Sequence, residues 1–220
     1  MWNKIQRIYV GQDLVRPKRH PWANTVGYWT FDDQNANQIT DVSWNWNNLA
    51  FTGGTKITYS QLSWSDYYWN FNKSQYNKAI TGVSNYTWCL WCKIAQTWQQ
   101  YIMNNAWVDL IYWFQSWQIE VYDYYNWSTY RSTIKSSTPL NTRMCIWFTK
   151  NGSTVTKYYN WSKIWTATFA NYDLTSITIG WNASQGVIGS MNNVILENKV
   201  RTDTEMSNYY DTTKSEYWIS

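Results

Sequence analysis

Short apolar runs alternate with polar clusters between residues 142 and 200. The apolar runs are rich in β-branched and aromatic residues, and Asn, Gly and Ser fill the positions between them. Such alternation is typical of successive antiparallel strands joined by tight turns. The expected strands lie at 145–149, 154–159, 166–169, 176–180 and 187–196. Together they predict a β-meander.

The same alternation continues upstream. Turns are expected at Gly53-Gly54 and at Gly82, because glycine marks breaks between strands. Further strands are expected at 26–31, 49–51, 56–59, 67–71, 78–81, 86–94, 100–103, 108–114, 117–124 and 129–134. Near the N-terminus, two short apolar runs at 5–10 and 14–15 predict a small hairpin, which Pro17 ends.

A different pattern begins after residue 200. Thr202 and Glu205 have the spacing of a capping box, in which each side chain bonds to the other residue's backbone N–H. Met206, Tyr209 and Tyr210 follow at helical spacing. These residues predict a short C-terminal helix.

Two segments and the order of the later strands carry a family resemblance. The segments are GYWTFDD at 27–33 and DVSWNWNN at 41–48. They resemble the opening strand and the following polar turn of the LamG-like, concanavalin A-like lectin-glucanase domains, and 142–200 resembles the second half of that fold. The resemblance covers most of 26–210. It implies an all-β fold, a two-sheet antiparallel jelly-roll sandwich.

The chain length suits one such sandwich, because 220 residues supply one sizeable core and not two comfortable domains. We therefore expect residues 1–21 to form an N-terminal hairpin and linker. Residues 22–220 are expected to form the LamG-like jelly-roll domain, including the small C-terminal helix.

Six tryptophans occupy positions where the family pattern has glycine. At 160–162 the reason is physical, because a two-residue hairpin turn needs positive φ, which Gly or Asn tolerates and Trp does not. An ordinary domain of this length has about 15 glycines, whereas this chain has 9, with 19 tryptophans. The six are Trp44, Trp46, Trp127, Trp161, Trp165 and Trp181.

One hypothesis explains both counts. Under this hypothesis the source organism uses an alternative genetic code in which the codon UGA specifies glycine. The sequence shows tryptophan at those codons because it was translated with UGA read as tryptophan. A non-glycine residue in a left-handed turn costs about 1–2 kcal/mol, so six would consume much of a stability of about 5–15 kcal/mol. The alternative is a tryptophan-rich protein whose loops adopt other turn types.

Composition limits the class of partner and the location. Only 15% of residues are charged, the net charge is +4, and the basic residues are scattered except at 16–19. This pattern argues against nucleic acid as the main partner. No secretory signal and no apolar run long enough for a membrane span are present. The N-terminal segment, with IYVG at 8–11 and LVRP at 14–17, is similar to the openings of phage structural proteins. We therefore expect the protein in a virion or extracellular surface assembly if its source is a phage, and in the cytoplasm otherwise.

Catalytic residues are not evident in the sequence. A glycosidase on this fold would need two carboxylates across a cleft, but Glu120 and Asp123 have opposite parity along their strand. His20 is the only histidine, and it lies among prolines. The sequence therefore shows no evident Ser-His-Asp or Cys-His arrangement for nucleophilic catalysis. We expect no catalytic residues and no enzyme activity.

Cysteines can form redox or metal sites, but the spacing of the three in this chain does not match such a site. Cys89 and Cys92 form a C-x-x-C, but on a strand they would face opposite sides, and no second pair follows. Cys145 makes the count odd. We interpret all three as core or near-core thiols.

The family resemblance implies a calcium site near the first and last strands, built from carboxylates and carbonyls, which suit a hard cation. Asp32, Asp33 and Asp41 could supply part of it. Where many relatives have an acidic residue in the closing strand, this chain has Asn193. The alternative is that these are ordinary polar loop residues. Calcium is the only cofactor that the sequence suggests.

Apart from the six tryptophans at expected glycine positions, the densest cluster of aromatic and polar residues consists of Tyr122, Tyr124 and Tyr125 beside Asp123. Aromatic rings stack on sugar faces, and the parity of Tyr122 and Tyr124 puts them on one face of their strand. They are the candidate ligand-binding residues, and packing between sheets is the alternative. The sequence therefore suggests a recognition module that binds carbohydrate or a surface protein, in a phage particle or surface assembly. The alternative is a structural or homo-oligomerising jelly roll, and a glycoside hydrolase ranks third.

Overall fold

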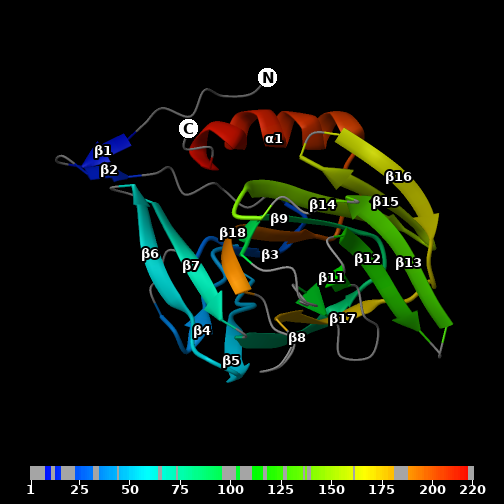
Figure 1. Cartoon of the computed structure of the whole chain (residues 1–220), viewed down its shortest axis with the longest axis horizontal. Coiled ribbons are helices and arrows are strands. Elements are labelled where there is room, and N and C mark those ends of the chain that lie inside the picture. Colours follow the sequence, from blue (N-terminus) through cyan, green and yellow to red (C-terminus); the bar gives the residue numbers. More distant parts are fainter. Residues whose placement is uncertain are drawn as a thin grey trace.

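Antiparallel strands make up most of the computed structural model. It describes residues 8–10, 13–15, 23–31, 35–43, 45–63, 66–72, 74–95, 103–104, 111–115, 118–125, 128–135, 137, 140–160, 162–180 and 188–217. Two large antiparallel sheets pack face to face, and one helix lies on the outside (Figure 1). This confirms the expected all-β, two-sheet sandwich with a C-terminal helix.

The larger sheet contains eight strands. In order they are β16 (Ser162–Thr168), β15 (Thr154–Tyr159), β14 (Arg143–Asn151), β9 (Tyr86–Ile94), β18 (Ile188–Glu197), β7 (Asp66–Asn72) and β6 (Thr58–Ser63). The eighth strand, β3 (Thr25–Trp29), pairs with the end of β18 that β7 leaves uncovered. An extra residue in β18 near Asn193, whose φ is 43°, separates the two pairings, as expected for a β-bulge.

The second sheet contains five strands, in the order β10 (Met103–Asn104), β17 (Leu174–Ile179), β8 (Gln75–Val83), β5 (Leu49–Gly53) and β4 (Gln38–Ile39). Two smaller sheets complete the strands. The N-terminal hairpin pairs β1 (Ile8–Val10) with β2 (Asp13–Val15), as predicted. A three-stranded sheet joins β11 (Ile111–Gln115), β12 (Gln118–Tyr125) and β13 (Ser128–Lys135). The boundary expected at residue 21 stays a prediction.

Two tight hairpins join the first three strands of the expected meander. Asn151 pairs with Thr154 and Tyr159 pairs with Ser162, so each loop has two residues. Positive φ values of 56° at Gly152 and 53° at Asn160 start these loops, which is typical of the primed turns in hairpins. This part of the meander is confirmed.

The last two strands do not continue the meander. β17 crosses to the second sheet, where it pairs with β8, and β18 returns to the middle of the large sheet beside β9. The prediction of one meander was therefore wrong beyond β16. Alternation of apolar and polar residues identifies strands, but it does not identify which sheet a strand joins.

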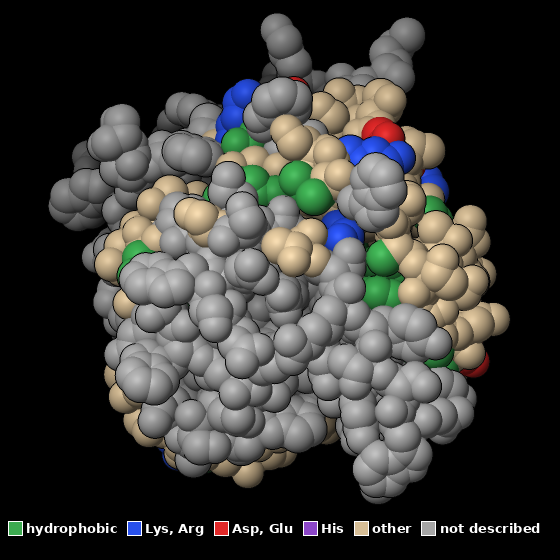
Figure 2. Space-filling model, turned by 45° about the vertical axis from the view of Figure 1, so that its right-hand side comes forward, with side chains coloured by type: hydrophobic (Ala, Val, Ile, Leu, Met, Phe, Trp, Pro, Cys, Tyr) green, Lys and Arg blue, Asp and Glu red, His purple; other side chains and the backbone are tan. Residues whose placement is uncertain are grey.

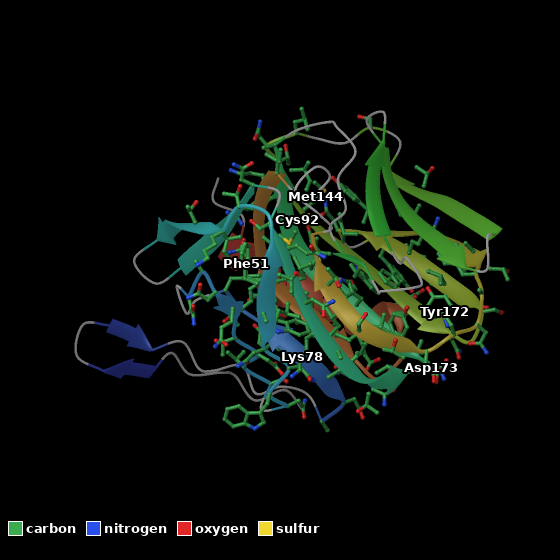
Figure 3. All side chains as sticks on the ribbon, turned by 90° about the horizontal axis from the view of Figure 1, so that it is seen from below. Phe51, Lys78, Cys92, Met144, Tyr172 and Asp173 are labelled. Atoms are coloured by element: carbon green, nitrogen blue, oxygen red, sulfur yellow. The ribbon has the colours of Figure 1, made fainter. Side chains whose placement is uncertain are left out.

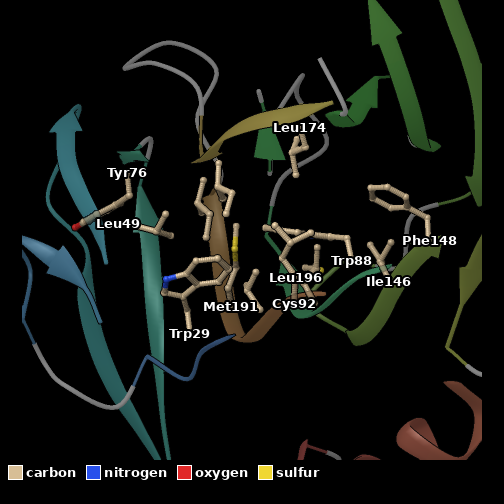
Figure 4. Packing of buried hydrophobic residues seen from close by; sticks show 14 of the residues in the cluster. Trp29, Leu49, Tyr76, Trp88, Cys92, Ile146, Phe148, Leu174, Met191 and Leu196 are labelled. Atoms are coloured by element: carbon tan, nitrogen blue, oxygen red, sulfur yellow. The ribbon is translucent and has the colours of Figure 1, made fainter. Parts of the chain in front are cut away.

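The centre of the large sheet is buried on both faces. On β9, Trp88 and Cys92 face the second sheet, within the main core (Figure 4). Cys89 and Trp91, on the other face of β9, pack under the helix α1 (Asp203–Tyr217). Because both faces are covered, β9 is an almost continuous buried run and does not alternate between buried and exposed positions.

Helix α1 is attached by the residues that the sequence indicated. The Thr202 hydroxyl accepts the Glu205 N–H at 3.2 Å, and the Glu205 carboxylate accepts the Thr202 N–H at 2.9 Å, so the capping box is confirmed. Met206, Tyr209 and Tyr210 are buried against the sheet. The Tyr210 ring stacks on Trp91 with 5.5 Å between ring centroids.

Candidate functional site

The buried carboxylate of Asp41 organises the polar turn after the first sandwich strand. Its oxygens accept three backbone N–H groups, from Tyr28 at 2.9 Å, Ser43 at 2.8 Å and Asn47 at 2.9 Å. Hydrogen bonds to a charged acceptor are the stronger kind. Asp41 therefore holds both ends of the turn against β3.

Two asparagine side chains complete the attachment. The Asn45 amide donates to the Thr25 carbonyl at 2.5 Å, and the Asn47 amide donates to the Val26 carbonyl at 2.7 Å. The buried Trp29 indole donates to the Asn47 carbonyl at 3.0 Å. The backbone on both sides of position 46 is thus held in place by bonds that do not involve position 46.

Trp46 is consequently held in an unfavourable conformation. Its φ is 58°, and 77% of its side chain is exposed. Of the other described non-glycine residues with positive φ, three are asparagines and the fourth, Phe31, is buried in the core. Asparagine tolerates this region better than most residues, and burial can compensate Phe31. Trp46 has neither advantage.

A groove of about 430 Å³ lies between the two sheets, beside this turn. Its walls come from the start of β3, the end of β8 and the turn itself. Figure 3 views the molecule from below, with Lys78 on β8 and Asp173 before β17 labelled. The groove is lined by Ala23, Asn24, Thr25, Val26, Asn45, Asn47, Ile80, Thr81, Gly82, Val83 and Asn198. None of these residues is charged.

One lining residue carries a polar atom without a partner. Thr25 is only 8% exposed, and its hydroxyl oxygen makes no hydrogen bond within the described part of the chain. In contrast, its backbone carbonyl accepts the Asn45 amide. Most buried hydroxyls in proteins are hydrogen-bonded, so the Thr25 hydroxyl is an exception within the described part of the chain.

The predicted calcium ligands are only partly described. Asp32 and Asp33 lie outside the described residues, and Asp41 is committed to the three N–H groups of its turn. Those positive dipoles occupy most of the acceptor positions of a carboxylate, so the arrangement at Asp41 fits a structural role better than a metal ligand. Among the described residues no three His, Cys, Asp or Glu side chains cluster as a metal site. Calcium binding stays a prediction.

The tyrosine cluster lies in the three-stranded sheet. Tyr122 and Tyr124 alternate with Asp123 on β12, where the backbone of Tyr122 pairs with Arg131 and that of Tyr124 with Thr129. Positions 122 and 124 therefore share one face of β12, while Tyr125 ends the strand. The role of the cluster in ligand binding stays a prediction.

The cysteines are buried, as expected. Cys92 belongs to the main core and Cys89 to the cluster under α1, so the two lie on opposite faces of β9. The Cys89 and Cys145 sulfurs are 3.6 Å apart. Burial raises the pKa of the Cys92 and Cys145 thiols, which disfavours the reactive thiolate.

Sequence analysis identified the turn but not the groove. Asn45 and Asn47 fall in the recognised segment 41–48, whereas Thr25, Ile80 and Asn198 come from three other parts of the chain. Thr25 begins β3 and Asn198 follows β18, and loops at strand ends often carry binding residues. Ile80 lies within β8 and carries no such signal. Among the described side chains on the face shown in Figure 2, the charged ones lie at separate places.

The fold is similar to those of solved binding domains. Domain 4 of AbnA, a GH43 extracellular arabinanase from Geobacillus stearothermophilus, solved in complex with arabinotriose, superposes with a TM-score of 0.69 at 16% identity, over 84% of this chain and 97% of that one. The binding domain of Paraclostridial Mosquitocidal Protein 1 gives 0.69 at 13% identity, over 86% and 52%. The binding domain of botulinum neurotoxin serotype G gives 0.69 at 12% identity, over 90% and 53%.

These likenesses show the fold class, an antiparallel β-sandwich. The chain spans about half the length of the toxin binding domains. No protein-family model and no curated protein matches the sequence. Within the described residues no helix is long and apolar enough to cross a membrane.

Proposed function

We propose that this chain is a non-catalytic recognition module that binds carbohydrate through a LamG-like sandwich. The observation that carries the proposal is the groove between the sheets, which combines amide and hydroxyl groups with the apolar side chains of Val26 and Ile80. Amide and hydroxyl groups supply the donors and acceptors that sugar hydroxyl groups can bind. The fold shared with carbohydrate-binding domains supports the same reading.

A binding role agrees better with the groove than catalysis does. Glycoside hydrolysis needs two carboxylates across the substrate, and none of the described lining residues of the groove is acidic. A glycan array identifies a ligand for the module. Incubation of that glycan with the protein, followed by analysis of its reducing ends, should then leave the glycan intact, and new reducing ends would contradict the non-catalytic assignment.

The module's place in a phage particle or other surface assembly is a further part of the proposal. It rests on the N-terminal segment, whose sequence is similar to the openings of phage structural proteins that join a recognition module to a larger assembly. A purely structural or oligomerising jelly roll is the second candidate, and a surface protein is the alternative ligand. A chain that binds no glycan but self-associates in sedimentation experiments would favour the second candidate.

We also propose that position 46 is glycine in the natural protein. Trp46 has positive φ, its side chain is mostly exposed, and the hydrogen bonds of Asp41, Asn45 and Asn47 fix the turn around it. Glycine adopts this conformation without steric cost. The alternating Asn-x-Asn sequence of the turn would then read as an ordinary glycine-containing loop.

A second turn supports the same substitution. Tyr159 pairs with Ser162, and Asn160 has a φ of 53°. A two-residue loop that begins in this way is typical of a type I′ turn, whose preferred sequence is Asn-Gly. Trp161 itself lies outside the described residues, as do Trp44, Trp127 and Trp181. Trp165 lies on β16 next to a register shift, a place where glycine is common.

The coding DNA tests this proposal directly. UGA codons at positions 46 and 161, with UGG at the core residues Trp88 and Trp147, are expected. Mass spectrometry of the peptide from Lys157 to Lys163 in native material gives an independent reading of residue 161. Tryptophan in that peptide, or UGG at position 46, would contradict the proposal.

A further inference from the structure

We propose that Asn151 is a site of spontaneous deamidation and that the Asn85 side chain controls the rate of this reaction. Asn151 and Gly152 form the only Asn-Gly pair in the sequence. They lie at the tip of the β14–β15 hairpin, where Asn151 pairs with Thr154. The inference goes beyond the proposed function and does not depend on the groove or on the residue at position 46.

Deamidation at an Asn-Gly pair is a reaction within the chain. The backbone nitrogen of Gly152 loses its proton to water or hydroxide and attacks Cγ of Asn151. A bond forms between that nitrogen and Cγ, the bond between Cγ and Nδ2 breaks, and the amide nitrogen takes up protons and leaves as ammonia. Water then opens the resulting five-membered ring at either carbonyl, which yields aspartate or isoaspartate. Water is the only co-reactant.

The local structure leaves this pair open to the reaction. Asparagine is one of the chemically labile residues of proteins, and glycine has no Cβ atom to hinder the approach of its nitrogen. Asn151 is exposed. A Cβ atom added to Gly152 would meet no atom of the described chain within 4 Å. Water and hydroxide can therefore reach both residues.

One hydrogen bond opposes the reaction. The Gly152 N–H donates to Oδ1 of Asn85 at 2.7 Å. Asn85 lies in the turn between β8 and β9, and this turn is beside the β14–β15 hairpin because Tyr86 pairs with Lys150. The attacking nitrogen must give up the bond to Asn85 before it can lose its proton. Asn85 therefore slows the first step without contacting the carbon that is attacked.

Deamidation would alter the hairpin as well as its charge. Either product places a carboxylate at position 151, and isoaspartate also adds a methylene group to the backbone. The loop between Asn151 and Thr154 has two residues, and the register of the two strands depends on a loop of that length. The isoaspartate form should therefore pair β14 with β15 less well than the unmodified chain does.

The test follows the full chain during incubation at mildly alkaline pH, with samples digested by trypsin at successive times. Cleavage after Lys150 and Lys157 releases a peptide in which Asn151 is the only residue with a side-chain amide. Mass spectrometry measures conversion of the amide to a carboxyl group, and chromatography separates aspartate from isoaspartate. Asn141, which is exposed and followed by threonine, is the internal control. A digest of protein that was not incubated corrects for deamidation during digestion.

Two variants and the unfolded chain give distinct expectations. N85A should deamidate at Asn151 about two- to tenfold faster than the wild type, the value of one neutral hydrogen bond. N85D keeps an oxygen acceptor for the Gly152 N–H and should be no faster than the wild type. The wild type unfolded in urea should be faster than when folded, because unfolding releases both the bond and the turn. Asn141 should change far less in every sample.

The other outcomes overturn different parts of the proposal. Equal rates in N85A and the wild type would overturn the role of Asn85. N85D as fast as N85A would also overturn it, because the cause would then be a loosened turn and not a lost acceptor. Urea unfolding of both variants verifies that the fold is intact. No conversion of Asn151 in either N85A or the unfolded wild type would overturn the site itself.

Discussion

The strain at position 46 can be measured by comparing two substitutions, Trp46→Gly and Trp46→Ala. Both remove the same indole ring, so the small area that Trp46 buries cancels between them. The two variants then differ in how well they adopt a φ of 58°. Their relative stability reports the backbone conformation and not the lost side chain.

The expected difference follows from two opposing effects. A residue with a Cβ atom in the left-handed region costs about 1–2 kcal/mol, which favours glycine. Glycine in turn loses more freedom on folding, by about 0.4–1 kcal/mol relative to alanine. Trp46→Gly should therefore be more stable than Trp46→Ala by about 0.5–1 kcal/mol, because the flanking hydrogen bonds of Asp41, Asn45 and Asn47 impose the conformation.

Urea unfolding monitored by circular dichroism measures this difference as a shift in the midpoint at constant slope. The control is the same pair of substitutions at Asn208, an exposed position in α1. There alanine should be more stable than glycine by about 1 kcal/mol, so the sign should reverse between the two positions. An alanine variant at 46 as stable as the glycine variant would refute the reasoning and remove the main structural support for glycine at this position.

Three further predictions concern the supporting network and its charges. Asp41→Asn should destabilise the chain by about 2–3 kcal/mol, because one carboxylate accepts three backbone N–H groups and bonds to charged acceptors are worth about 1.5–3 kcal/mol each; an unchanged urea midpoint would contradict this. Bonds from Lys199 and Thr202 lower the pKa of Glu205 to about 2, so this carboxylate stabilises the fold at neutral pH and loses that contribution as pH falls from about 4.5 to 2. The advantage of the wild type over E205Q should shrink across that window, and a constant difference would count against it. Burial lowers the pKa of Lys157 to about 8. Because the unfolded chain keeps this proton to higher pH than the folded chain does, Lys157 should destabilise the fold least at high pH. The gain in stability of K157M over the wild type should therefore decline from pH 8 to 10.5, and a gain that does not vary with pH would refute this prediction.

Local features of the chain could be predicted from the sequence because they depend on neighbours a few residues away. The capping box of Thr202 and Glu205, the two-residue hairpins and most strands required only the residue pattern and the turn chemistry. The unusual position of Trp46 was also visible, because a polar turn around asparagines requires a residue that accepts positive φ. These conclusions hold in the folded chain because tertiary packing agrees with the local preferences.

Tertiary structure decided which strands pair and which residues meet. The crossing of β17 to the second sheet and the insertion of β18 beside β9 depend on long-range pairing, which alternation of residues does not encode. The groove has the same origin, since Thr25 and Asn198 on the large sheet meet Ile80 on β8 only when the two sheets pack against each other. The unpaired hydroxyl of Thr25 could not be foreseen for this reason: a side chain's hydrogen-bond partners depend on its neighbours in space, and those are fixed by the packing of two sheets.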